Sequence, residues 1–145
     1  MHFQLTEDLT LIQDMARQFA EAELAPYAEK WDQEKFLDRS VFEKAAELGF
    51  LGIYIPEEDG GTGLSRLASA IVFEQLAAGD VSHTAMMTIH NMASWMIATF
   101  ADQALKDRYL PKLIAGEMIA SYCLTEPGSG SDAASLSTKA VRDGD

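Results

Sequence analysis

The chain has 145 residues, of which 48% are hydrophobic, enough to form one sizeable hydrophobic core. Its 23 Asp and Glu residues outnumber its 11 Lys and Arg residues, and the formal net charge is −12. Such a surface repels nucleic acid and anionic lipid, which disfavours both as partners. The single cysteine, Cys123, excludes an intrachain disulfide and a zinc ribbon.

The amino-terminal residues show no basic stretch followed by an apolar one, so we expect no secretory signal. No apolar run approaches the roughly 18 to 20 residues of a membrane-spanning helix. These features favour a protein without a membrane segment, and the cytoplasm is its expected location.

The amino-terminal quarter predicts two helices. Thr6 is a good cap for the first, because acidic residues follow it and apolar residues then recur at three- and four-residue spacing as far as Phe19. Pro26 marks a break and is expected to open a second, short helix that runs through Trp31.

A third helix and a polar loop follow. Ser40 and Glu43 have the spacing of a capping box, and Gly49 is placed to end the helix that they begin. The next residues, FLGIYI at 50–55, look extended and lead into a glycine-rich loop at 57–65.

The central segments 65–78 and 81–100 are apolar on nearly every side, which is typical of helices buried among several neighbours. A last helical stretch begins near Asp102 and meets Pro111, which should bend or end it.

From Gly116 the pattern changes. MIASYCLT looks extended, and LSTKAV alternates weakly between apolar and polar residues. Two strands do not form a stable sheet alone in water. The sequence therefore predicts a mainly α fold, with an all-α domain at residues 1–117 and the opening of a truncated β domain at 118–145.

A glycine pattern, Gly128-x-Gly130-x-x-Ala133, lies after the extended run. A Rossmann turn is disfavoured because no βαβ unit precedes it, and a P-loop is excluded because no Lys-Ser/Thr pair follows. The two glycines allow close approach of a ligand, and Ser129, Ser131 and Asp132 add short polar groups. These residues alone leave a binding loop and a plain turn open, with the turn favoured.

Other candidate sites are weaker. His83 and His90 share a helix face, but neither has a second ligand at helical spacing, so buried polar roles are favoured over metal binding. The acidic residues 57–59 lack the spacing of a calcium loop. Cys123 has no nearby base, and Glu126 is expected to face water.

Residues 122–132, YCLTEPGSGSD, closely resemble the acyl-CoA dehydrogenase signature Tyr-Cys-Leu/Val-Thr-Glu-Pro-x-Ala/Ser-Gly-Ser-Asp. The resemblance extends through YIPEEDGGTGLS, the segment IHNM at 89–92 and RYLPKLIAGE. The segment TIHNM at 88–92, followed by Trp95, is most similar to the isobutyryl-CoA branch of the family, which belongs to valine breakdown.

This resemblance implies an FAD enzyme with an all-α amino-terminal domain, a middle β-barrel and a carboxy-terminal four-helix domain, assembled as a homotetramer. In the family a Glu removes the α-proton of the acyl-CoA, a hydride passes to the flavin, and an electron-transfer flavoprotein collects the electrons. That Glu lies outside this chain, so no catalytic residue is assigned and the fragment is expected to be inactive. An acyl-CoA oxidase and a non-catalytic helical interaction module are the alternatives.

The family's cofactor contacts fall on one short segment of this sequence. By resemblance, Tyr122, Leu124, Thr125, Gly130 and Ser131 contact the flavin, and Ser131 also reaches the acyl-CoA. The resemblance further implies that the acyl tail ends near Thr84, Thr88 and Asn91.

Overall fold

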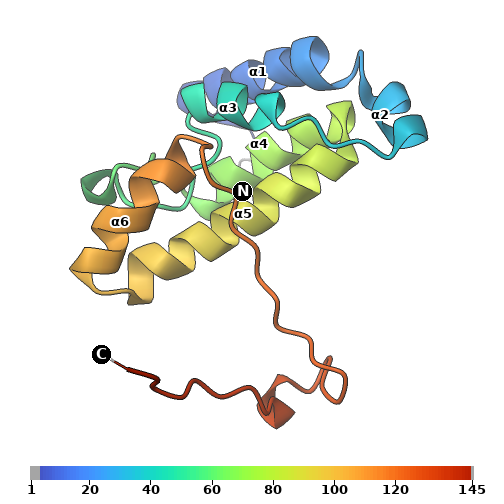
Figure 1. Cartoon of the computed structure of the whole chain (residues 1–145). Coiled ribbons are helices and arrows are strands. Elements are labelled where there is room, and N and C mark those ends of the chain that lie inside the picture. The colour runs from blue at the N-terminus through green and yellow to red at the C-terminus, as the bar shows by residue number, and fades with distance from the viewer. Residues whose placement is uncertain (1–3, 145) are drawn as a thin grey trace.

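The apolar spacing of residues 7–114 produces a helical body, followed by an extended tail (Figure 1). The computed structural model describes residues 4–144. Its α-helices are α1 (Glu7–Phe19), α2 (Ala28–Glu34), α3 (Ser40–Glu47), α4 (Arg66–Gly79), α5 (Val81–Phe100) and α6 (Gln103–Ile114). Shorter turns are the π-helical η1 (Ala20–Leu24) and the 3-10 helices η2 (Glu57–Asp59) and η3 (Ala133–Ser135). The predicted helical class is confirmed.

Side chains cap four of these helices where the sequence places a short polar residue. Thr6 Oγ1 accepts from the Leu9 N–H at 3.3 Å, which confirms the predicted start of α1. Equivalent caps at α4, α5 and α6 come from Ser65, Asp80 and Asp102. Each cap satisfies an amide that has no partner within its own helix. The two central helices therefore begin within one residue of the predicted positions.

The predicted cap at Ser40 is wrong, and of the bend or end predicted at Pro111 the end is excluded. Ser40 is not a cap but the first residue of α3, and both its N–H (3.0 Å) and its hydroxyl (2.8 Å) donate to the Asp38 carboxylate. Pro111 does not end α6, which continues to Ile114. Proline removes only one backbone hydrogen bond, and buried leucines on both sides of it, at 110 and 113, hold that stretch in the core.

The end of α3 follows the prediction. Gly49 takes a left-handed φ of +76°, its N–H donates to the Ala46 carbonyl at 2.8 Å, and the Phe50 N–H donates to the Ala45 carbonyl at 2.9 Å. This pair of bonds is a Schellman motif, in which glycine avoids the steric cost of the left-handed conformation.

The segment 50–55 is not a strand. It forms a series of turns, and its apolar side chains are buried in the core; these are Phe50, Leu51, Ile53 and Ile55. Asn91 of α5 supplies hydrogen bonds to two backbone groups of this segment. Its Oδ1 accepts from the Ile53 N–H at 2.9 Å, and its Nδ2 donates to the Phe50 carbonyl at 2.8 Å.

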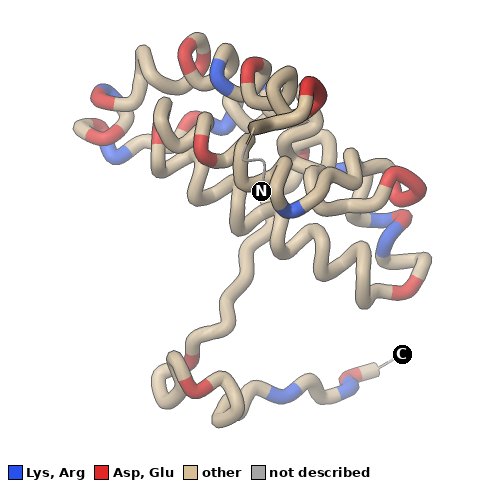
Figure 2. Tube along the Cα trace, turned by 180° about the vertical axis from the view of Figure 1, so that it is seen from behind, with Lys and Arg blue, Asp and Glu red and all other residues tan. Residues whose placement is uncertain are grey.

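The helices pack in a chain of contacts, α1 on α4, α4 on α5 and α5 on α6 (Figure 1). Two clusters of buried apolar residues result. The larger gathers side chains from α1 to α5, including Phe19, Phe42 and Met87, and the smaller joins Ile55 to α5 and α6. Acidic residues occur at positions spread along the helices (Figure 2). No helix between residues 4 and 144 is long and apolar enough to cross a membrane.

The tail runs from residue 119 to 144 and extends away from the helices (Figure 1). No strand occurs in the described part of it; an isolated bridge joins Glu126 to Ser129. An extended segment needs partners to supply its hydrogen bonds, and the helical body offers it no sheet. The division of the chain into domains at residues 117 and 118 stays a prediction.

Candidate functional site

The signature segment contains a tight turn with paired backbone groups. The Glu126 N–H donates to the Ser129 carbonyl at 2.9 Å, and the Ser129 N–H donates to the Glu126 carbonyl at 3.1 Å. Proline and glycine at 127–128 suit the tip of such a turn. Ser129 is buried, and its hydroxyl donates to the Asp132 carbonyl at 2.6 Å and accepts from Ser135 Oγ at 3.2 Å. The turn is thus held by its own polar groups.

Glu126 does not simply face water, as the sequence suggested. It is half-buried, and its carboxylate accepts from both the backbone N–H and the hydroxyl of Ser137 and of Thr138. These bonds lower the pKa of Glu126 from 4.5 to about 2, and the Thr138 hydroxyl makes the largest contribution to this shift. A carboxylate with such a low pKa and this many donors is a structural clamp and a poor base. The donors lie eleven and twelve residues further along the chain, so no local sequence pattern pointed to this clamp.

The predicted cofactor contacts lie on the outside of this turn and of the chain leading to it. All five are exposed; they are Tyr122, Leu124, Thr125, Gly130 and Ser131. Within residues 4–144, the hydroxyls of Thr125 and Ser131 take part in no hydrogen bond, unlike that of Ser129. A Cβ added at Gly128 or Gly130 would meet nothing within 4 Å. The segment therefore combines a fixed turn with open backbone and unused donors.

The two buried histidines have structural partners. His83 Nδ1 lies 2.6 Å from the Asp80 carboxylate, and its Nε2 accepts from the Asp38 N–H at 3.1 Å. His90 is fully buried and also has a partner at each ring nitrogen. The predicted buried polar roles are confirmed. Among the described residues, no group of three His, Cys, Asp or Glu side chains could hold a metal ion.

By resemblance, three polar residues lie near the end of the acyl tail. Their side chains form hydrogen bonds within the helical body. The Thr84 hydroxyl donates to the Asp80 carbonyl and the Thr88 hydroxyl to the Ala85 carbonyl, each at 2.7 Å. Asn91 is completely buried by its contacts with segment 50–55. Thr88 is only half-buried, and it is the one of the three that best fits a ligand-facing position.

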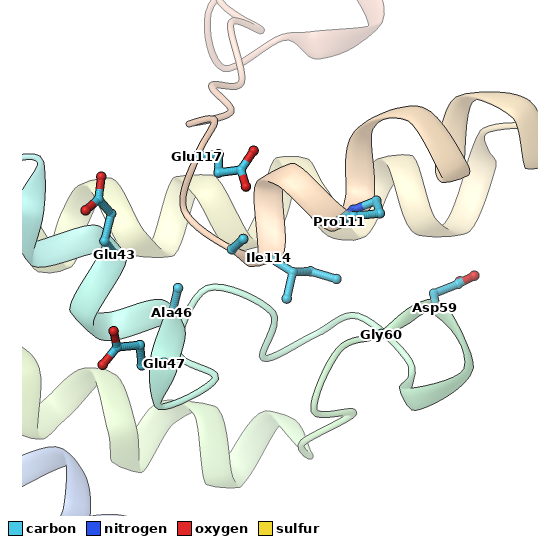
Figure 3. Close-up of a pocket in the computed structure, with 9 residues that line it drawn as sticks. Glu43, Ala46, Glu47, Asp59, Gly60, Pro111, Ile114 and Glu117 are labelled. Carbon is cyan, nitrogen blue, oxygen red and sulfur yellow. The ribbon is translucent and has the colours of Figure 1, made fainter.

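A hollow lies elsewhere, between α3, η2 and the end of α6 (Figure 3). It has a volume of about 590 Å³ and is lined by Glu43, Ala46, Glu47, Asp59, Gly60, Pro111, Ile114, Ala115 and Glu117. Asp59 pairs with Lys106 at 3.1 Å. None of the predicted cofactor or substrate residues lines it.

Comparison with known families identifies the helical body. Residues 6–117 match the family described as "Acyl-CoA dehydrogenase, N-terminal domain". The chain belongs to the acyl-CoA dehydrogenase family. The match covers every helix from α1 to α6, and the signature segment follows directly after it.

Individual relatives support the assignment of this chain to the acyl-CoA dehydrogenase family. It is 55% identical to the mitochondrial isobutyryl-CoA dehydrogenase of Dictyostelium discoideum and 50% identical to that of Bos taurus, in each case over 97% of this chain and 34% of the relative. It also resembles an acyl-CoA dehydrogenase from Bacillus anthracis solved with FAD (TM-score 0.81, 34% identity, 92% of this chain and 23% of that one). The chain thus spans about a third of the length of the relatives it matches. Both relatives are named as mitochondrial, and the cytoplasmic location stays a prediction.

Proposed function

We propose that this chain is the amino-terminal part of an FAD-dependent dehydrogenase that oxidises a short branched acyl-CoA of the isobutyryl type. The observation that carries this proposal is the segment 122–132, whose turn is held by internal bonds while two hydroxyls beside it stay unused. The similarity to two isobutyryl-CoA dehydrogenases supports the substrate class.

The residues present fit a flavin. Tyr122 and Leu124 are both more than a third exposed and offer apolar surface to a planar ring. Thr125 and Ser131 can donate hydrogen bonds to polar edges, and Gly130 lets a ligand approach the backbone because no Cβ is in the way. When bound, FAD would accept the hydride from the substrate. The protein's part here is to position and desolvate the ring.

Ser131 has a second role in this proposal, as a contact to the acyl-CoA. The catalytic base, the remaining barrel and the tetramer contacts would lie outside this chain, and an electron-transfer flavoprotein would receive the electrons. One wall of a flavin site does not hold the cofactor tightly, because a bound ring needs contacts on several sides. The isolated chain should therefore be inactive with added FAD, and it should be colourless once the unbound FAD has been removed.

The test compares two serines in the full-length protein. Ser131→Ala removes an unused hydroxyl, and a net hydrogen-bond contribution of about 0.5–1.5 kcal/mol predicts roughly three- to tenfold weaker acyl-CoA binding with an unchanged melting temperature. Ser129→Ala is the matched control, because its hydroxyl is bonded within the turn and its loss should affect stability first. Isobutyryl-CoA is titrated while flavin reduction is recorded. Equal isobutyryl-CoA affinity in Ser131→Ala and wild type, or no flavin reduction in wild type, would refute the proposal.

A further inference from the structure

The tail leaves the helical body at one well-defined point. Ile119 and Ala120 still pack against the two core clusters, and the Ala120 N–H donates to Nδ1 of His90 at 3.1 Å. After Ala120, the hydrogen bonds formed by the described tail residues join tail residues only to one another. His90 is therefore the last hydrogen-bonding tether before Tyr122, where the signature segment begins.

His90 is itself held in one orientation. It lies on α5 with no exposed surface, and its Nε2 donates to the Leu113 carbonyl at 3.2 Å, near the end of α6. A ring that accepts at Nδ1 and donates at Nε2 is the neutral tautomer with its proton on Nε2. Burial lowers the pKa of His90, which keeps this neutral form present at neutral pH. One imidazole thus connects α5, α6 and the tail.

We propose that His90 is a positioning residue for the cofactor segment, because it sets the point at which the tail leaves α5. This inference rests on the proposed function, since it concerns the placement of the same segment. Without the tether, the nearest hydrogen-bonded residue is Met118, whose N–H donates to the Lys112 carbonyl at 3.1 Å. Release of residues 119 and 120 would add up to about 7 Å of reach. An error of about 1 Å in a catalytic geometry can already cost a hundredfold in rate, so this freedom matters.

Two substitutions separate the tether from general packing. His90→Asn places an oxygen near the position of Nδ1, where it can still accept from Ala120. His90→Gln reaches the position of Nε2 and can still donate to Leu113, but it leaves Ala120 without an acceptor. Each variant keeps one of the two bonds and leaves a small void, so their melting temperatures should fall by similar amounts.

The readout is the backbone order parameter of residues 121–125, measured by nitrogen-15 relaxation on the labelled chain without flavin. We expect lower values in His90→Gln, in the flexible range below ~0.6, than in wild type and His90→Asn. If the histidine variants do not fold, Ala120→Pro removes the donor directly. Ser121→Pro is its control, because the Ser121 N–H has no partner among residues 4–144. Equal order parameters within either pair would overturn the tether.

The consequence for the cofactor is measured separately, in the full-length protein. His90→Gln should bind FAD up to about tenfold more weakly than His90→Asn, which is the loss of one net hydrogen bond. A freed tail with equal FAD affinity in both variants would overturn the positioning role. A wild-type protein that binds no FAD would instead refute the proposed function, while the order parameters would still decide the tether.

Discussion

Replacing Asn91 by alanine removes the side chain that holds segment 50–53 against α5. The carboxamide accepts from the Ile53 N–H at 2.9 Å and donates to the carbonyls of Phe50 (2.8 Å) and Met87 (2.9 Å). Phe50 and Ile53 are 1% and 0% exposed, so water cannot replace these bonds. Neither the Ile53 N–H nor the Phe50 carbonyl forms another hydrogen bond within residues 4–144.

The expected loss in unfolding free energy follows from the groups left without partners. A buried donor or acceptor without a partner costs about 1–3 kcal/mol, and two such groups cost about 2–6 kcal/mol before any term for the cavity is added. Small domains have total stabilities of about 5–15 kcal/mol. Asn91→Ala should therefore lose a large fraction of the stability of the helical body, and the body should unfold at low urea concentration.

Urea unfolding followed by far-ultraviolet circular dichroism measures this loss. Ser94→Ala is the control, because Ser94 is equally buried on the same helix but lies at a weak 3.5 Å from His90 Nε2. We expect the control to lose less than about 1 kcal/mol. If Asn91→Ala and Ser94→Ala unfold at the same urea concentration, packing and not Asn91 holds segment 50–53, and the reasoning is wrong.

Three further substitutions or titrations test local features. Lys35 takes a left-handed φ of +52°, so Lys35→Gly should be more stable than Lys35→Ala by about 1 kcal/mol in urea unfolding, and equal stability would contradict the strain. Gly61→Ala should lower the unfolding free energy by about 1–3 kcal/mol, because the new Cβ would lie 2.1 Å from the Ile55 carbonyl oxygen, whereas Gly128→Ala meets nothing and should change little. The pKa of Glu126 is about 2 in the folded chain against 4.5 ordinarily, so its clamp should stabilise the tail above pH 4.5 and be lost as the pH falls through about 2. An amide chemical-shift titration of its donors with a midpoint near 4.5 would refute the clamp.

Local features of this protein were determined by the sequence alone. A cap such as Thr6 or Asp102 acts on an amide three residues further on, so its partner is always nearby along the chain. The helical spacing of apolar residues likewise depends only on neighbours within a few turns. The signature at 122–132 was readable for a related reason, since a run of adjacent residues specifies it.

Other features depended on partners far away in the sequence. α3 begins at Ser40, whose N–H and hydroxyl donate to the Asp38 carboxylate, and the stretch before it is held by a distant residue, because the Asp38 N–H donates to the ring of His83. Segment 50–55 has the composition of a strand, but it forms buried turns instead. Two of its backbone groups bond to the Asn91 amide on α5, and several of its carbonyls accept from the N–H groups of residues 62–64.

The candidate site likewise combines features that the sequence determines with features that only the tertiary structure decides. The exposed positions of Thr125 and Ser131 agree with the sequence prediction that they are available to a ligand, and their contacts to flavin and acyl-CoA stay predictions. The clamp at Glu126 and the tether at His90 could not be predicted, because their partners lie at least eleven and about thirty residues away. Whether a carboxylate or an imidazole faces water or backbone depends on which distant amides the fold brings to it, and only the tertiary structure decides that.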